Sequence, residues 1–338
     1  MKRIVLSALA VAAIASCTKN EVIPETNELQ EITFRTIVGP QTKALGEGQV
    51  KYAGEAFYST AFYLDAPKTW ADKFSDAVVY LNDKIIKSGT EWKAVQSYYW
   101  PKGGKLTFMS YALLDAANKY METTPTVISA AKTGVTVADF NVNTYKDYDL
   151  LVAKIASDKN ANEKVYLTQG VPTLFGHKLC KLAITAQTDK AYTTKTFTIK
   201  SILINDLQST GTYNMTAAGV ESWGSYKNPD DVTFYTDGTG MTINNDADNT
   251  TKTTITASQS VYLPQNFQDT ETITINYTIT TGAVVETVSV TKKFSEIFTG
   301  NWEMNKMYSI NITFGLNEIL WDPAQTDWTD GADGSVSL

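Results

Sequence analysis

The sequence predicts an all-β protein built from antiparallel β-sandwiches, and three observations lead to this prediction. Thr occurs 47 times and Tyr 18 times among 338 residues, and both residue types fit pleated, half-buried strands. Several segments alternate apolar and polar residues with the period of two that a strand requires. Helical periodicity is scarce, and residues 113–122 are the best short-helix segment. Many strands with little helix favour sandwiches over a helix-crossed parallel sheet.

The composition bounds the classes of function. Hydrophobic residues make up 43% and charged residues 19%, which is enough apolar material for a sizeable core. A net charge of −7, a pI near 4.9 and the lack of a Lys/Arg cluster argue against nucleic-acid binding. One histidine and two cysteines are too few for a Cys/His zinc site or a disulfide framework. We therefore expect no metal and no cofactor.

The N-terminus carries an export signal. Lys2 and Arg3 precede an apolar run over 4–14 that is too short to span a bilayer, so residues 1–16 are predicted to be a signal peptide. Ala15 and Ser16 directly before Cys17 match the lipobox of bacterial lipoproteins. Cys17 is then acylated, for example with palmitate, and anchors the chain to a membrane. The alternative is an ordinary signal peptide with a coincidental cysteine.

The first strand follows a polar tether over 17–30. Apolar and polar residues alternate from Ile32, so that Ile32, Phe34 and Val38 share one face and Arg35 lies on the other. Gly39-Pro40 ends this strand.

Further strand segments continue to the C-terminus. A hairpin is expected over 92–109 around a turn at 101–105, and a single strand over 177–186 with Cys180, Leu182 and Ile184 on one face. The other expected strands cover 55–64, 149–153, 165–167, 197–199, 202–204, 273–280, 284–294 and 308–314. Two sandwich domains fit this length, over 31–170 and 171–338, the second including a C-terminal tail region.

Catalytic chemistry is hard to assemble from these residues. His177 is the one imidazole, and on the predicted strand it faces away from Cys180, so a Cys/His pair is not formed. Cys180 is expected to be a buried apolar filler and His177 a structural hydrogen-bonding group. The Asp pairs, such as Asp230-Asp231, lie in turn-rich loops where Asp is common. We expect no catalytic residues and no enzyme.

Seven tryptophans could form platforms for glycans or fill the cores of the sandwiches. No exposed alternating run of aromatics is present, so core filling is the favoured interpretation.

Several short segments, taken together and in order, resemble the fimbrillin-like family of the type V pilus, in particular its minor-fimbrillin-like branch. They are the start at Cys17 to Val22, Ile32-Thr33-Phe34 with Thr42-Lys43-Ala44, Asp149 to Ala153, Phe175 to Leu179, Leu263-Pro264-Gln265, Trp302 to Tyr308 and Trp321 to Trp328.

The resemblance implies two transthyretin-like sandwich domains, export as an outer-membrane lipoprotein, and assembly into cell-surface fimbriae that serve adhesion. In that family a trypsin-like surface protease removes the first strand, and a strand of a neighbouring subunit fills the groove. The partners implied are other pilus subunits, the outer membrane through the lipid on Cys17, and a host protein or glycan.

Mapped onto this sequence, the removable strand contains Ile32, Phe34 and Val38. The protease would cut after Arg35 or after Lys43, and both remain open.

The donor strand would be the C-terminal segment with Ile319, Leu320, Trp321 and Trp328, in which Pro323 is expected to interrupt the strand ladder.

Whether such a subunit would form the stalk, the tip or the anchor is left open by the sequence. The alternative function is a monomeric glycan-binding lipoprotein of the outer-membrane surface. A secreted hydrolase is a third class and would need two close carboxylates in a cleft.

Overall fold

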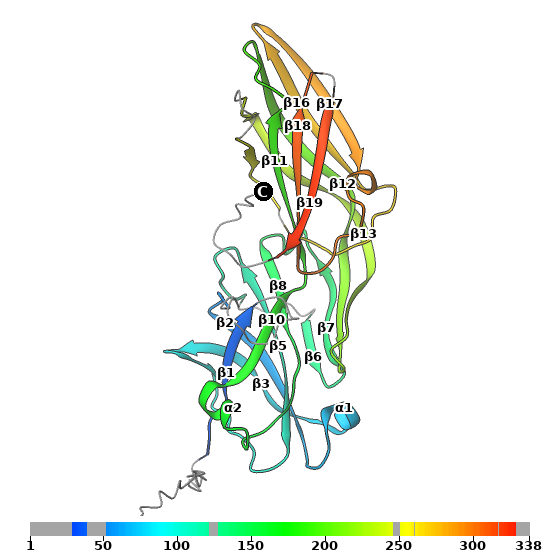
Figure 1. The fold of residues 1–338 in the computed structure, drawn as a ribbon. Coiled ribbons are helices and arrows are strands. Elements are labelled where there is room, and N and C mark those ends of the chain that lie inside the picture. Colours follow the sequence, from blue (N-terminus) through cyan, green and yellow to red (C-terminus); the bar gives the residue numbers. More distant parts are fainter. Residues whose placement is uncertain are drawn as a thin grey trace, which may run out of the picture.

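The computed structural model describes residues 29–38, 52–121, 128–245, 251–259, 261–316 and 318–328. The predicted signal peptide, Cys17 and Lys43 lie outside these residues. The described chain is composed almost entirely of strands, which confirms the all-β prediction. Figure 1 shows an elongated molecule in which two β lobes lie end to end.

The strands and helices follow one another along the chain with these bounds: β1 (Thr33–Val38), β2 (Ala56–Leu64), α1 (Trp70–Lys73), η1 (Phe74–Asp76), β3 (Val78–Ser88), β4 (Glu91–Ala94), β5 (Lys105–Asp115), β6 (Ile128–Ala131), β7 (Gly134–Asn141), β8 (Tyr148–Ala153), β9 (Ala156–Lys159), α2 (Lys164–Gln169), β10 (Val171–His177), β11 (Cys180–Thr188), β12 (Lys195–Thr216), β13 (Glu221–Thr242), β14 (Thr253–Ile255), β15 (Val261–Tyr262), β16 (Thr272–Thr281), β17 (Val284–Lys293), α3 (Phe294–Ile297), β18 (Lys306–Phe314) and β19 (Ile319–Asp327).

The sheet of the first lobe closes on itself. Its order is β2-β3-β4-β1-β10-β8-β5-β9, and β2 also pairs with β5. The strands from β2 through β1 and β10 back to β5 therefore form a ring. The ring encloses an aromatic core that includes Phe57, Trp92, Phe108 and Phe175. Closure satisfies strand edges that would otherwise be exposed.

The second lobe is a sandwich of two sheets around one core. One sheet has the order β14-β11-β18-β19, with β15 also on β11, and the other has the order β17-β16-β12, with β13 also on β12. Phe197, Ile275 and Ile312 are among the buried residues between them. Most pairings are antiparallel, but β11 and β18 run in parallel.

The long strands β12 and β13 join the lobes, as Figure 1 shows. The first half of β12 pairs with β16 from Lys195 to Asn205, and its second half pairs with β7 from Thr210 to Thr216. A separate apolar cluster, including Phe140 and Tyr213, packs β7 and β12 against the outer face of the ring. The lobes therefore share one continuous sheet, and this third cluster is a core common to the ring and to β12.

The predicted domain boundary at residue 170 stays a prediction. Hydrogen bonding of the first lobe continues beyond it, since β10 pairs with β1 and with β8 as far as His177.

The helix expected over 113–122 is wrong. Strand β5 continues to Asp115, and its residues from Leu106 to Leu114 are all buried because one face meets the ring core and the other meets β7 and β12. Burial on both faces removes the polar alternation that identifies a strand. Beyond the strand, Asp115 accepts hydrogen bonds from the backbone N–H groups of Ala117 and Lys119, and Asn118 has a φ of 62°. These features make a turn.

The hairpin expected over 92–109 is also wrong, because β4 ends at Ala94 and pairs with β3 and β1, whereas β5 pairs with β2, β8 and β9. The single strand expected from His177 divides into two, since β10 ends at His177 and β11 begins at Cys180 in another sheet. Strand β11 keeps the predicted alternation, with Cys180, Leu182 and Ile184 buried.

A buried ion pair lies where the chain crosses between the lobes. The Lys178 side chain is 2% exposed, and its Nζ lies 2.8 Å from Glu221 Oε1 on β13. Burial lowers the pKa of Lys178, and Glu221 opposes this shift. The Trp223 indole N–H donates to the Lys178 carbonyl oxygen over 2.6 Å. The crossing segment is therefore fixed to the long hairpin.

We predict that Glu221→Ala lowers the free energy of unfolding by about 3 kcal/mol, because it leaves the Lys178 ammonium buried without its carboxylate. Denaturant unfolding measures this loss. Lys227→Ala is the matched control, because the Lys227–Asp139 pair is exposed, and exposed pairs contribute about 0–1 kcal/mol. Equal losses of unfolding free energy in the two variants would contradict a larger contribution from the buried Lys178–Glu221 pair than from an exposed pair.

Candidate functional site

Strand β1 is the segment through which the ring of the first lobe closes. Its backbone pairs in parallel with β10, from Phe34 opposite Val171 to Val38 opposite Phe175. Its other edge pairs with β4 at Thr33 and Phe34. Just before β1, the Ile32 N–H donates to the Tyr98 carbonyl oxygen over 2.8 Å. The ring therefore depends on an N-terminal strand that is paired on both edges.

The inward face of β1 belongs to the ring core. Ile32 is 1% and Phe34 is 3% exposed. The Phe34 ring lies edge-on to Phe57 and Phe108, with centroid separations of 5.7 and 5.6 Å. For Val38 the structure describes only the backbone pairing, opposite Phe175.

The outward face of β1 carries Arg35, as the alternation predicts. Its Nη1 donates to Gln169 Oε1 over 2.5 Å. The backbone of Arg35 pairs with Pro172 on β10, so the bond from Arg35 to Thr36 lies within a paired strand. Proteases cut unpaired, accessible backbone, so cleavage after Arg35 requires β1 to open first.

Gly170 allows β10 to begin directly beside β1. It has a φ of +77°, and a Cβ built there would lie 2.7 Å from the Phe34 carbonyl carbon. Only glycine therefore fits this close approach.

A half-buried charge cluster lies at the start of β1. Lys93 Nζ on β4 is 3.0 Å from Glu31 Oε2 and 3.2 Å from Glu91 Oε2. Its hydrogen bond to Glu31, followed by that to Glu91, raises the pKa of Lys93. Ion pairs of this kind contribute little stability, so the apolar face of β1 holds the strand more than its charges do.

Three of the residues predicted as a donor, Ile319, Leu320 and Trp321, lie in β19, an edge strand of the second lobe. Strand β19 pairs with β18 without a break from Ile319 to Asp327, and Pro323 lies opposite Ile310. The expected interruption at Pro323 is therefore wrong, because an edge strand tolerates a residue without an N–H. Ile319 and Trp321 are half-buried, and Leu320 is 53% exposed.

Trp328 follows β19 and is 3% exposed. Its ring is stacked on that of His177 at the junction of the lobes. The structure does not bring β1 and β19 together, since they belong to different sheets in different lobes (Figure 1).

Cys180 and His177, the residue types that could carry catalysis, make structural contacts. The Cys180 side chain is fully buried, its thiol donates to the Tyr262 carbonyl oxygen over 3.4 Å, and burial raises its pKa. His177 Nδ1 lies 2.6 Å from Asp149 Oδ2. Across the part of the chain that the structure describes, no three His, Cys, Asp or Glu side chains are grouped to hold a metal ion.

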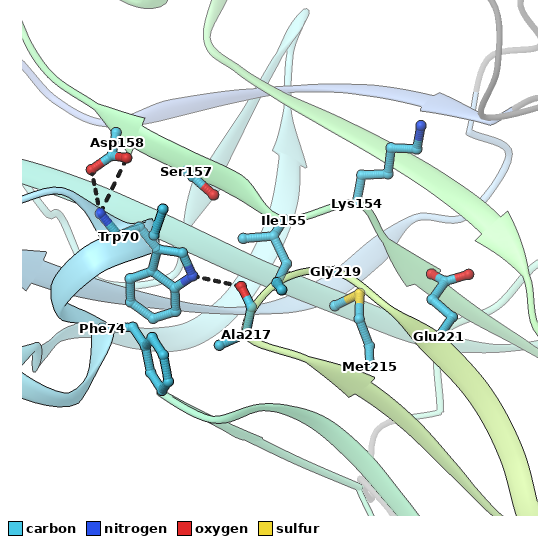
Figure 2. Close-up of a pocket in the computed structure, with 12 residues that line it drawn as sticks. Trp70, Phe74, Lys154, Ile155, Ser157, Asp158, Met215, Ala217, Gly219 and Glu221 are labelled. Atoms are coloured by element: carbon cyan, nitrogen blue, oxygen red, sulfur yellow. Dashed lines mark hydrogen bonds between the residues drawn. The ribbon is translucent and has the colours of Figure 1, made fainter.

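A cavity of about 490 Å³ lies where the tip of the β12–β13 hairpin meets the first lobe, and Figure 2 shows its lining. Its residues come from segments far apart in the sequence, so no motif pointed to it. The Trp70 indole N–H donates to the Ala217 carbonyl oxygen over 2.8 Å, and the Trp70 backbone N–H donates to the Asp158 carboxylate. Glu221, also on the lining, is engaged by Lys178. The Trp70 indole bond joins the first lobe to the hairpin, the Asp158 bond lies within the first lobe, and all of these groups already have protein partners.

The tryptophans fill cores, as the sequence favoured. Five are buried, namely Trp70, Trp92, Trp100, Trp302 and Trp328. Trp223 and Trp321 are half-buried. An aromatic platform for glycans would need exposed ring faces.

The helices of the described ranges are all too short or too polar to cross a bilayer.

Comparison with known proteins shows which folds are similar to this one. A comparison with curated proteins gives no match. A fimbrial protein from Bacteroides vulgatus has a similar structure, with a TM-score of 0.65 and 16% identity over 88% of this chain and 99% of that one. A structure described as that of a cell adhesion protein from Bacteroides uniformis has a TM-score of 0.51 and 18% identity, over 88% of this chain and 98% of that one. At these identities the likeness concerns the fold.

A sequence model of a protein family, described as fimbrillin-like, matches residues 62–328. That range begins within β2 and ends at Trp328, so it spans both lobes. The chain therefore belongs to the fimbrillin-like family.

Proposed function

We propose that this chain is a subunit of a cell-surface fimbrium that serves adhesion, and that it joins its neighbour by strand exchange at the position of β1. The observation that carries the proposal is the place of β1, an N-terminal strand that closes the ring by pairing with β4 on one edge and β10 on the other. Membership of the fimbrillin-like family and the likeness to a fimbrial protein support it.

Loss of β1 would create a binding site for a strand. The facing edges of β4 and β10 would present unpaired N–H and C=O groups, and Phe57 and Phe108 would lose the ring of Phe34. Unpaired backbone groups beside an apolar groove are costly in water. A strand from another subunit pairs with both edges and buries alternate side chains. Repeated head to tail, this contact gives a filament.

The precursor would be exported as a lipoprotein with its lipid on Cys17 and held at the outer membrane before processing. Cleavage after Lys43 would remove β1 entirely, whereas cleavage after Arg35 would leave Thr36 to Val38 on β10.

Strand β19, with Ile319, Leu320 and Trp321, is the donor we propose. It pairs with β18 along one edge only, so it can leave its sheet without breaking a second ladder.

The alternative of a monomeric glycan-binding lipoprotein has less support, because none of the seven tryptophans presents an exposed ring.

The N-terminal residue of the subunit in purified surface filaments tests the proposal. We expect it to be Thr36 or Ala44, because removal of the first strand precedes exchange. Replacing Arg35 or Lys43 by Ala identifies the cut, since only the variant at the cleaved residue should stop processing. Filament subunits that still begin at lipidated Cys17, or a protein found only as a monomer, would contradict strand exchange.

A second test measures how strongly the Phe34 side chain stabilises β1 in the ring. Phe34→Ala should lower the free energy of unfolding of the unprocessed subunit by about 3–5 kcal/mol, because it empties the centre of the ring core. Denaturant unfolding measures this loss. Leu29→Ala is the control, because Leu29 is 61% exposed, and its expected change is within about 0.5 kcal/mol.

Once filaments have formed, the Phe34→Ala subunit should resist denaturant as well as the wild type does, since the mutated strand has been removed. A weakened filament would instead indicate that β1 stays in place.

A further inference from the structure

Trp328 lies in a pocket made by both lobes. Its ring is parallel to the His177 imidazole, with an interplanar angle of 4° and centroids 3.9 Å apart. The Lys181 ammonium lies 4.3 Å from the Trp328 ring centroid. The Trp328 backbone N–H donates to the Asn305 carbonyl oxygen over 2.9 Å. These contacts come from β10, from β11 and from the turn before β18, so three separate segments converge on one side chain.

The groups that receive Trp328 are held in place by other contacts. His177 is 1% exposed and is fixed by Asp149 on β8, with Nδ1 and Oδ2 2.6 Å apart. Asn305 has a φ of 60°, and its N–H donates to the Leu179 carbonyl oxygen over 3.1 Å. A stacking plane and a carbonyl acceptor are thus held by contacts other than those with Trp328. This arrangement is a preformed receptor for an aromatic side chain.

The rest of the C-terminal segment is held weakly. Strand β19 lies at a sheet edge and pairs only with β18. Among residues 318–328, Trp328 is the one buried side chain. Backbone hydrogen bonds of an edge strand exchange for bonds to water at small net gain, so apolar burial decides whether the strand stays. Ile319 and Trp321 pack partly against the second-lobe core, and Trp328 adds the fully enclosed side chain of the segment.

We infer that Trp328 is a latch: its insertion beside His177 and Lys181 keeps β19 in its own sheet, and its withdrawal frees β19 as a unit without unfolding either lobe. Withdrawal can be selective because β19 is bonded along one edge and follows the other described strands in the chain. The inference rests on the proposed function only where it concerns a donor strand. The latch itself is a property of the single subunit.

Peptide-resolved hydrogen–deuterium exchange of the full-length Trp328→Ala subunit tests the latch. The amides of β19 should exchange about 100-fold faster, because loss of a buried tryptophan shifts local opening by that order. The amides of β12 and β16 should change by less than about threefold. Leu320→Ala, an exposed position on the same strand, is the matched control and should change β19 by less than about threefold.

Two milder variants keep the test decisive if Trp328→Ala does not fold. Trp328→Phe retains a smaller ring and should accelerate β19 exchange about 10-fold. Lys181→Met retains the stem without the ammonium and should accelerate it about 2- to 5-fold. Unchanged β19 exchange in these variants, or equal acceleration across both lobes, overturns the latch. Filament yield is measured separately: selective release of β19 without any change in assembly would contradict β19 as the donor and would leave the latch supported.

Discussion

The structure depends on the closure of the first ring by β1. Every other strand of that ring belongs to the chain after residue 52. Without residues 30–38, the gap between β4 and β10 would stay open. The N-terminal segment closes this gap by backbone pairing on both edges of β1 and by burial of Ile32 and Phe34. Because β1 precedes all the other strands of the ring in the chain, it is covalently joined to them only through its C-terminal end. Such a strand can be replaced without rethreading the chain.

The second constraint is the stiff junction between the lobes. The β12–β13 hairpin crosses it, and the two buried polar side chains at the crossing are paired: His177 with Asp149 and Lys178 with Glu221. Burying these groups is costly unless each has a partner, so their geometry is strongly specified. The cavity beside Trp70 adjoins the β12–β13 hairpin, where the Trp70 indole N–H donates to the Ala217 carbonyl oxygen.

Alternation of apolar and polar residues identified the strands that have one solvent-facing side. The segment from Ile32 to Val38 and the run from Cys180 to Thr188 match β1 and β11. It failed at β5, where Leu113 and Leu114 are buried from opposite sides by two different cores and so resemble a helical segment. It failed also at β4, which is short and whose partners β3 and β1 are set by the closure of the ring. Local pattern reports exposure along one strand, and it carries no information about which strand lies next to it.

The sequence by itself determined the all-β class and the inward face of the first strand, because these follow from residue type and a period of two. Tertiary structure alone decided that β1 lies between β4 and β10, that β12 serves both lobes, and that Trp328 ends against His177. Each of these contacts joins residues more than 50 positions apart or bridges separate sheets. Such contacts are selected by the packing of whole faces, which no short window of sequence contains.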